Sequence, residues 1–147
     1  MYFVRMDKFR VTRTLNTLVS KLNSSADEIL RKEFRITYSQ FRYLVVVNEN
    51  PGISVGQLAK ALSISQPAVS KKISEFLEQC LIASARDPEH KTKVVLRTTS
   101  KGKRLSERAS SVLEARFVNM LDFFQPGELE KFEGALQVML KKLSEKG

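Results

Sequence analysis

Residues 54–98 constrain the fold more than any other part of this chain, because they hold two short helical patterns followed by a charged β-hairpin pattern. The first helix is predicted over Val55–Ala61, since the preceding Ser54 is followed three residues later by a glutamine, which is the spacing of a capping box. The second is predicted to start from the cap Ser65, with a proline in its first turn, and to end near Gln79. Two short helices joined by a tight turn are typical of a helix-turn-helix.

The second helix has one apolar face and one polar face. Its apolar residues recur at helical spacing and are predicted to face the core: Val69, Ile73, Phe76 and Leu77. The other side chains, Glu75 among them, face outward, and seven positions are predicted to contact DNA: Ser65, Gln66, Ala68, Ser70, Lys71, Lys72 and Ser74. An amide, hydroxyls and two ammonium groups near the start of a helix suit the base edges of a major groove. The plain alternative is a solvated helix face.

The hairpin is predicted to have Leu81–Arg86 and Thr92–Thr98 as strands, with Asp87–Lys91 as the tip, because β-branched residues are enriched in the second strand. It completes a winged helix-turn-helix. Four cationic or titratable side chains of this wing are predicted to lie along the phosphate backbone or in the minor groove: Arg86, His90, Lys91 and Lys93. Arg97 adds to the same positive edge, and the alternative is a solvated charged turn.

The composition is that of an ordinary globular domain, with 42% hydrophobic and 28% charged residues, and this argues against a disordered chain. Twenty-five basic against sixteen acidic residues leave a net charge of +9, which favours an anionic partner, and double-stranded DNA is the predicted one. No apolar run approaches the ~20 residues that span a bilayer, and no secretory signal pattern is present. We therefore expect a cytoplasmic protein with no membrane partner.

Motifs for catalysis and metal binding are missing from the sequence. A single cysteine, Cys80, and a single histidine cannot form an internal disulfide or a zinc site, so no metal or cofactor is expected. The chain also has no phosphate-binding glycine loop and no nucleophile motif, and it is not predicted to be an enzyme. Cys80 is predicted to be a small buried side chain at the end of the second helix, and a redox-sensing thiolate is the alternative.

Amphipathic helices are predicted on both sides of residues 54–98. A long one is expected over about Asp7–Glu33, and a shorter one, opened by a capping box, over Tyr38–Asn48. After the hairpin, a helix capped by Thr99 or Ser100 is expected to run to about Phe124, and a final helix to open at the proline that follows. The predicted fold class is therefore mainly α with a small β-hairpin wing (α+β).

The helices at the two ends carry more apolar surface than a small winged domain can cover. We therefore predict one compact chain with a DNA-binding region over residues 36–98 and a helical dimerisation region over residues 1–35 and 99–147. A symmetric homodimer would bury this apolar surface. It would also set the two DNA-binding regions, each called the reading head below, roughly one DNA turn, ~34 Å, apart. The alternative is that the end helices close a monomeric core.

This order of elements resembles the MarR family of transcription regulators over nearly the whole chain. The resemblance rests first on the residues that lead into and form the two short helices: Ile36, Thr37, Gln40, Phe41, Leu58, Ala59, Leu62 and Gln66–Ser70. It continues through the wing and the run that follows it: Arg86, Pro88, Glu89, Lys91, Leu96, Thr99 and Gly102. The chain departs from the family pattern at Glu89 and Lys91, where Asp and Arg are usual, and at Cys80, where Gly is usual.

The resemblance implies a homodimeric regulator, usually a repressor, on a pseudo-palindromic operator. It also implies a small phenolic or other aromatic effector, and the aromatic residues near the junction of the end helices with the reading head are Phe34, Tyr38, Phe41 and Tyr43. Core packing is the alternative role for most of them. Lysine at position 91 offers a point charge and not a bidentate fork, which weakens the minor-groove contact that the family makes through Arg.

A second function class remains open beside the sequence-specific regulator. A winged-helix interaction module could bind nucleic acid loosely through its positive charge or dock a protein through the second helix. Steep salt dependence without sequence preference would favour this module.

Overall fold

The computed structural model describes residues 7–145. Contacts between residues divide the chain into two compact units, Met1–Ser111 and Val112–Gly147. The residues after Ser111 contact mainly one another. Within the described part, no helix is long and apolar enough to cross a membrane.

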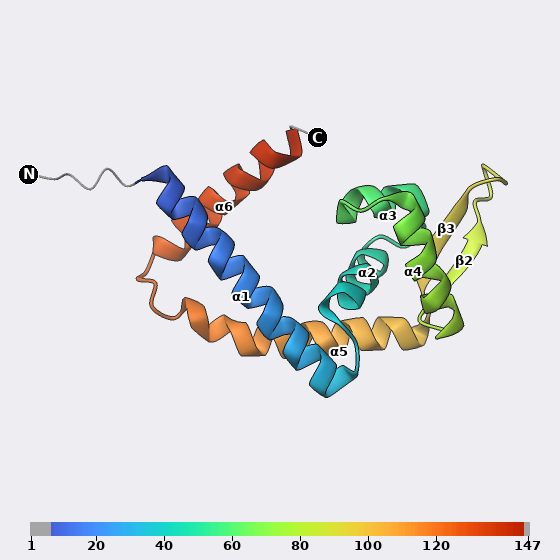
Figure 1. The fold of residues 1–147 in the computed structure, drawn as a ribbon, viewed down its shortest axis with the longest axis horizontal. Helices are drawn as coiled ribbons and strands as arrows, with labels where there is room; N and C mark the ends of the chain where they lie inside the picture. The colour runs from blue at the N-terminus through green and yellow to red at the C-terminus, as the bar shows by residue number, and fades with distance from the viewer. Residues whose placement is uncertain (1–6, 146–147) are drawn as a thin grey trace, which may run out of the picture. The chain divides into compact units, whose positions relative to one another are not determined.

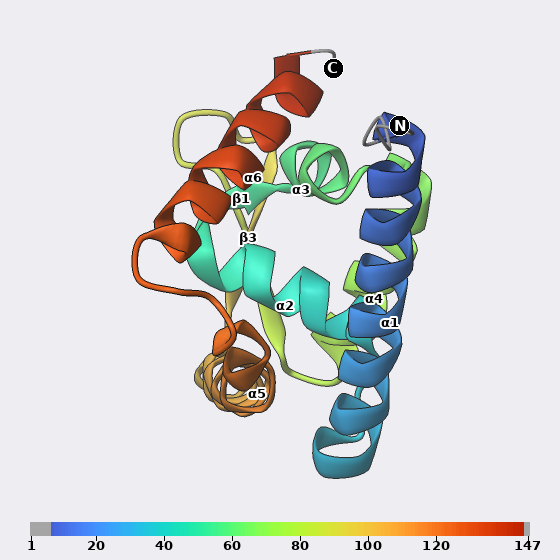
Figure 2. The same cartoon turned by 90° about the vertical axis from the view of Figure 1, so that its left-hand side faces the viewer.

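The first unit holds the long helix, the two short helices and the hairpin (Figure 1). Its elements in chain order are α1 (Lys8–Phe34), α2 (Tyr38–Glu49), β1 (Ile53–Ser54), α3 (Val55–Leu62), α4 (Gln66–Glu78), β2 (Ile82–Arg86), β3 (Val94–Thr98) and the start of α5 (Ser100–Phe117). These bounds agree with the predicted helices to within about two residues, because the caps that define them are local sequence features. Figure 2 shows α2 close to α1, and α2 also contacts α3 and β3.

Capping boxes open α2 and α3, as the sequence predicted. In α2 the Thr37 hydroxyl accepts a hydrogen bond from the Gln40 N–H at 3.0 Å, and the Gln40 side chain accepts one from the Thr37 N–H at 2.8 Å. The same pair of bonds joins Ser54 and Gln57 at the start of α3, at 3.1 and 3.0 Å. Each box satisfies two backbone donors that have no partner inside the helix, so both helix starts are held in place.

The sheet has three antiparallel strands in the order β1-β3-β2. The sequence did not predict β1, because this strand has two residues and exists only through its pairing with the distant β3, where Ile53 lies opposite Leu96. The hairpin strands are shorter than predicted: Leu81, Thr92 and Lys93 lie outside them. Leu81 instead donates its N–H to Phe76 at 3.0 Å and belongs to the turn after α4.

The core of the first unit lies between α2, α3, α4 and the sheet. Phe76 and Leu96 are fully buried there, and the Tyr43 ring lies 5.6 Å from the Phe76 ring. Leu77, which was predicted to face this core, is 37% exposed. At ~100° per residue, Leu77 lies about 80° around the helix from Val69, at the edge of the buried stripe.

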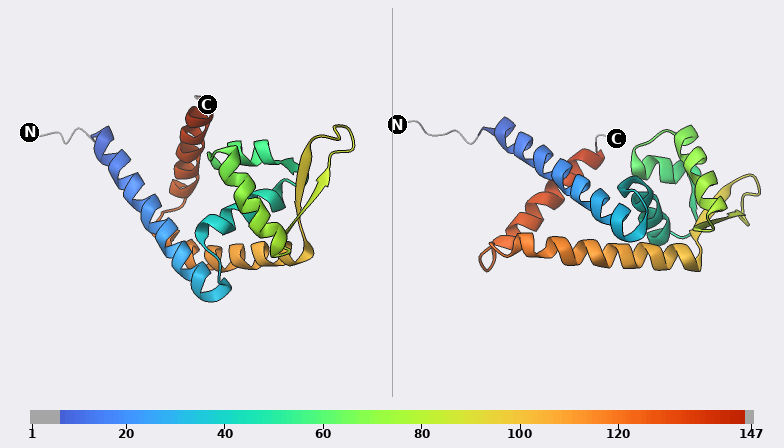
Figure 3. Two further views of the ribbon diagram at one scale, coloured as in Figure 1. Left: turned by 45° about the vertical axis from the view of Figure 1, so that its right-hand side comes forward. Right: turned by 60° about the horizontal axis from the view of Figure 1, so that its bottom comes forward.

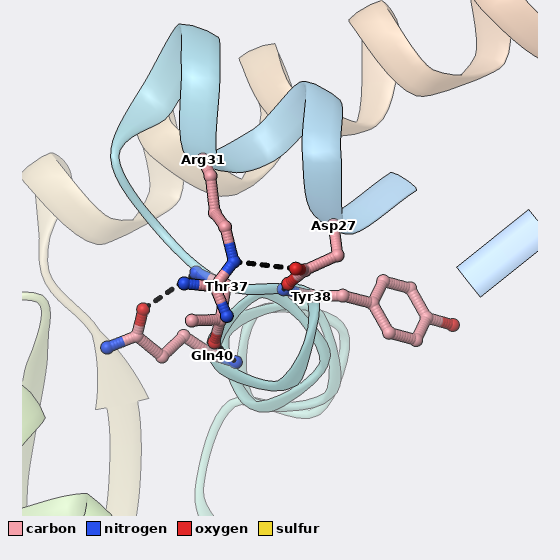
Figure 4. Close-up of polar contacts among 5 residues, drawn as sticks. All are labelled: Asp27, Arg31, Thr37, Tyr38 and Gln40. Carbon is pink, nitrogen blue, oxygen red and sulfur yellow. Dashed lines mark hydrogen bonds and ion pairs between the residues drawn. The ribbon is translucent and has the colours of Figure 1, made fainter. Parts of the chain in front are cut away.

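A carboxylate joins α1 to α2 at the turn between them (Figure 4). Asp27 accepts a hydrogen bond from the Tyr38 N–H at 2.8 Å and pairs with the Arg31 guanidinium at 2.6 Å. The bond from the Tyr38 N–H lowers the pKa of Asp27 below its usual value, and Arg31 lowers it further. The Asp27 carboxylate is therefore ionised at neutral pH, and it satisfies a free N–H in the first turn of α2.

The second unit differs from the prediction at both of its helices. The helix α5, expected to reach Phe124, ends at Phe117 and continues as the short 3-10 helix η1 (Val118–Leu121). The final helix α6 (Glu128–Glu145) starts two residues after Pro126, because Gly127 adopts a φ of 85° that no helix allows. The Phe124 ring lies 4.4 Å from the Phe123 ring and 5.1 Å from the Phe132 ring, so the segment after η1 packs against α6.

Cys80 is exposed, so the prediction that it is buried is wrong. The residue follows the end of α4 with a φ of 57°, a left-handed conformation that turns its side chain away from the core. Left-handed backbone crowds the Cβ atom of an L-residue, and glycine avoids this cost.

We therefore expect Cys80→Gly to raise the free energy of unfolding by about 0.5–1 kcal/mol. Chemical denaturation under reducing conditions measures this free energy. Gln79→Gly is the matched control, because Gln79 has a right-handed φ of −79° and should lose stability on the same change. A Cys80→Gly protein that is less stable than the wild type would contradict the assignment of strain to this position.

Candidate nucleic-acid interface

A serine cap and a proline define the first turn of α4, and this turn is exposed. The Ser65 hydroxyl accepts a hydrogen bond from the Ala68 N–H at 3.4 Å, and a proline follows Gln66 in the first turn. Val69 is fully buried, and Lys71 lies almost opposite to it around the helix. The first turns of α4 therefore present Gln66, Ala68 and Lys71 to solvent.

Six of the seven residues predicted to contact DNA from α4 are exposed, and Lys72 is half-buried. The Lys72 ammonium pairs with the Glu75 carboxylate at 3.2 Å, whereas Lys71 forms no ion pair among the described residues. The Ser74 hydroxyl donates to the Ser70 carbonyl at 3.1 Å, so it is partly engaged by the helix itself. Lys71 is consequently the cation of this face that is free to meet an anion.

Tyr43 is a buried residue of α2 whose ring packs against Phe76 of α4. Burial raises the pKa of Tyr43 above its usual value, and the nearby charge of Lys72 opposes this effect. Burial disfavours the phenolate, because charge is costly away from water. Tyr43 therefore stays neutral and packs in the core. Core packing is the alternative role that the sequence left open for it.

The wing tip is closed by its own hydrogen bonds. The Asp87 N–H donates to the Lys93 carbonyl and the Lys93 N–H donates to the His90 carbonyl, both at 2.8 Å. The Arg86 guanidinium donates to the Lys91 carbonyl at 3.1 Å, a structural role that the sequence did not indicate. Figure 3 shows the hairpin projecting beyond α4. All four predicted wing residues are exposed: Arg86 ends β2, and the other three lie in the loop between β2 and β3.

Two contacts that the sequence did not indicate anchor the wing to the helices. The Thr98 hydroxyl donates to the side-chain oxygen of Asn48 at 3.0 Å, which joins β3 to α2. The Gly52 N–H donates to the Leu96 carbonyl at 2.8 Å, which joins the loop before β1 to β3. The wing and the helices of the reading head are therefore tied together through β3.

Hydrogen bonds also join the start of α5 to the turn at the end of α4. The Thr99 hydroxyl donates to the Cys80 carbonyl at 2.6 Å and accepts from the Gly102 N–H at 3.0 Å, which makes Thr99 the cap of α5. The Lys101 ammonium donates to the Gln79 carbonyl at 3.2 Å. A cation at the carbonyl end of a helix is favourable, and Lys101 fills that place for α4 from another element.

The comparisons with known proteins agree with this architecture. Residues 36–91 match the model of the MarR family. The solved structure of the transcriptional regulator SlyA is 26% identical and has a TM-score of 0.79, with 92% of this chain and 95% of that chain covered. Residues 36–91 of this chain are therefore similar to the MarR family.

Two further proteins are similar to this chain, the first in fold and the second in sequence. The structure of *Streptococcus pneumoniae* FabT in complex with DNA has a TM-score of 0.85 at 17% identity, with 96% of this chain and 100% of that chain covered. An uncharacterized HTH-type transcriptional regulator of *Bacillus subtilis* (strain 168), YybA, is 28% identical over 88 residues. That match covers 60% of this chain and 59% of the length of YybA. Family and fold are those of transcriptional regulators.

The structure gives a physical reason for one motif that the sequence shares with the MarR family. In the run of Leu96, Thr99 and Gly102, Thr99 caps α5 and Gly102 lets the first turn of α5 approach the turn after α4. A Cβ atom built on Gly102 would lie 2.0 Å from the Leu81 carbonyl oxygen. Glycine at this position is therefore a condition for joining α5 to the reading head.

Proposed function

We propose that this protein is a sequence-specific, DNA-binding transcriptional regulator. The observation that carries the proposal is the exposed start of α4, where Gln66, Ser70 and Lys71 face solvent beside a cationic wing. Amide and hydroxyl groups suit base edges, and cations suit phosphates. The net charge of +9 and the DNA complex of the similar FabT structure support the same partner. Such a regulator acts in the cytoplasm and needs no enzymatic activity.

We further propose that the active form is a homodimer. Large apolar side chains of both units are exposed to solvent in the single chain, among them Phe9, Val19, Phe123, Phe132, Leu140 and Leu143. Exposed apolar patches of this kind mark association surfaces. A two-fold dimer would bury them and present two copies of α4 to a pseudo-palindromic operator, as the family resemblance implies. Binding that covers a promoter would make the protein a repressor.

Relief by a small aromatic effector completes the proposal. Of the four aromatic candidates, Tyr43 belongs to the core, whereas Phe34, Tyr38 and Phe41 are half-buried and accessible in part. The Arg108 guanidinium lies 5.8 Å from the centre of the Phe34 ring, so the flat face of that ring is already in contact with a cation. Tyr38 and Phe41 are therefore the better candidates for effector contact.

The test is selection of bound sequences from a random duplex pool at about 0.15 M salt, with sedimentation of the free protein. We expect a dimer that recovers an inverted repeat with half-sites ~10 base pairs apart. The Gln66→Ala, Lys71→Ala double variant should stay folded and lose the preference, and removal of Lys71 should lower the salt slope of binding by about 1.

The matched control is the Gln137→Ala, Lys141→Ala double variant, which removes the same residue types from exposed positions of α6. It should keep the wild-type preference. Unchanged preference in the Gln66→Ala, Lys71→Ala variant would refute the role assigned to α4. A monomer that binds any duplex with a steep salt slope and recovers no motif would instead identify the protein as a non-specific interaction module.

A further inference from the structure

We infer that Gly56 of α3 is a positioning residue that sets the place from which Gln66 reads DNA. This inference rests on the proposed function. A Cβ atom built on Gly56 would lie 2.6 Å from the Gln66 amide nitrogen and 3.8 Å from its amide carbon. The Gln66 side chain therefore occupies the space that any other residue at position 56 would need.

The backbone of Gly56 does not itself require glycine. Positive φ values occur at Gly52 and Gly127 among the described glycines, whereas Gly56 lies within the helix α3. Glycine in a helix costs stability relative to alanine, because the unfolded chain has more freedom to lose. The space for Gln66 is thus the structural reason for glycine at this position, in contrast to Gly102, whose neighbour is backbone.

Both ends of the contact have a fixed backbone. The capping box of Ser54 and Gln57 holds the first turn of α3, in which Gly56 lies. The cap of Ser65 holds the first turn of α4, in which Gln66 lies. A methyl group at position 56 can therefore be accommodated by movement of the Gln66 amide, which is the far end of a flexible side chain.

The chemistry of the amide makes its position matter. Glutamine reads adenine in the major groove through two hydrogen bonds, to N6 and N7, and both bonds need the amide in one plane with the base. Displacement of the amide costs these bonds without touching the phosphate contacts of Lys71 or the wing. Gly56 should consequently influence the preference at one base pair of each half-site and leave overall phosphate binding unchanged.

The experiment measures binding of Gly56→Ala to the operator selected by the wild-type protein and to the four versions of each base pair. We expect the adenine preference at the pair read by Gln66 to fall by roughly fivefold or more. The salt slope and the preferences at the other pairs should not change, and the melting temperature should be equal to or above that of the wild type.

Two controls assign the effect to Gln66. Gly134→Ala makes the same replacement in a helix where an added Cβ meets nothing within 4 Å, and it should leave every preference unchanged. In a Gln66→Ala background, Gly56→Ala should give a folded protein with no further change in preference. Equal or higher adenine preference in Gly56→Ala, or a further change in the Gln66→Ala background, would overturn the inference.

The outcomes separate this inference from the function on which it rests. If the wild type recovers no sequence motif, the proposed function and the inference are both wrong. If the wild type recovers a motif and Gly56→Ala reads it as the wild type does, Gly56 has no positioning role and the proposed function stands.

Discussion

Gly102→Ala is expected to lower the free energy of unfolding by more than about 3 kcal/mol, because the new methyl group has no space. Its Cβ atom would lie 2.0 Å from the Leu81 carbonyl oxygen and 2.9 Å from the Leu81 carbonyl carbon. Both atoms belong to the backbone of a buried residue, so a rotamer change cannot relieve the overlap. Either α5 moves away from α4 or the turn at Leu81 breaks.

The same movement would break the hydrogen bonds of Thr99, which cap α5 and hold the Cys80 carbonyl. Chemical denaturation at one fixed protein concentration measures the loss, since association shifts apparent stability. Gly134→Ala is the control, and it should raise the free energy of unfolding by about 0.5–1 kcal/mol. A Gly102→Ala protein as stable as the wild type would show that α5 does not approach Leu81 this closely in solution.

Phe76→Ala is expected to lower the free energy of unfolding by about 3–5 kcal/mol. Phe76 is 1% exposed and is among the largest fully buried side chains of the described residues. Its ring packs at 5.6 Å from the Tyr43 ring, so truncation removes burial from α4 and a ring contact from α2 together. The cavity that remains adds to the lost transfer free energy, because the helices around it cannot fully collapse.

Leu77→Ala is the matched control on the same helix. Leu77 is 37% exposed, and we expect its truncation to cost about 1 kcal/mol or less. Urea titration of both variants gives the two free energies. Equal losses would mean that Leu77 packs against the core as the sequence pattern predicted. The buried face of α4 would then include Leu77.

Local signals in the sequence predicted most of the fold of the first unit. The capping boxes at Thr37 and Ser54 and the cap at Ser65 each involve residues three apart, and all three are present. The wing was visible as a run of β-branched residues after a charged turn. These elements could be predicted because their determining contacts lie within one turn of a helix or one hairpin.

The candidate site was predictable in composition but not in arrangement. The exposure of Gln66, Ser70 and Lys71 follows from helical spacing, whereas the engagement of Lys72 by Glu75 was not assigned from the sequence. Helical periodicity also placed Leu77 in the core, where it is not buried. Helical spacing predicts the direction in which a side chain points. How far around a helix the burial extends depends on the elements that pack against that helix.

The sequence by itself determined where helices begin, which face of α4 is polar and which family the chain resembles. The tertiary structure alone decided the pairing of Ile53 with Leu96, the bond from Tyr38 to Asp27 and the close approach of Gly102 to Leu81. It also placed Gly56 against Gln66. Each of these contacts joins residues ten or more positions apart. No short-range pattern encodes such contacts, because the packing of whole elements must first bring the two partners together.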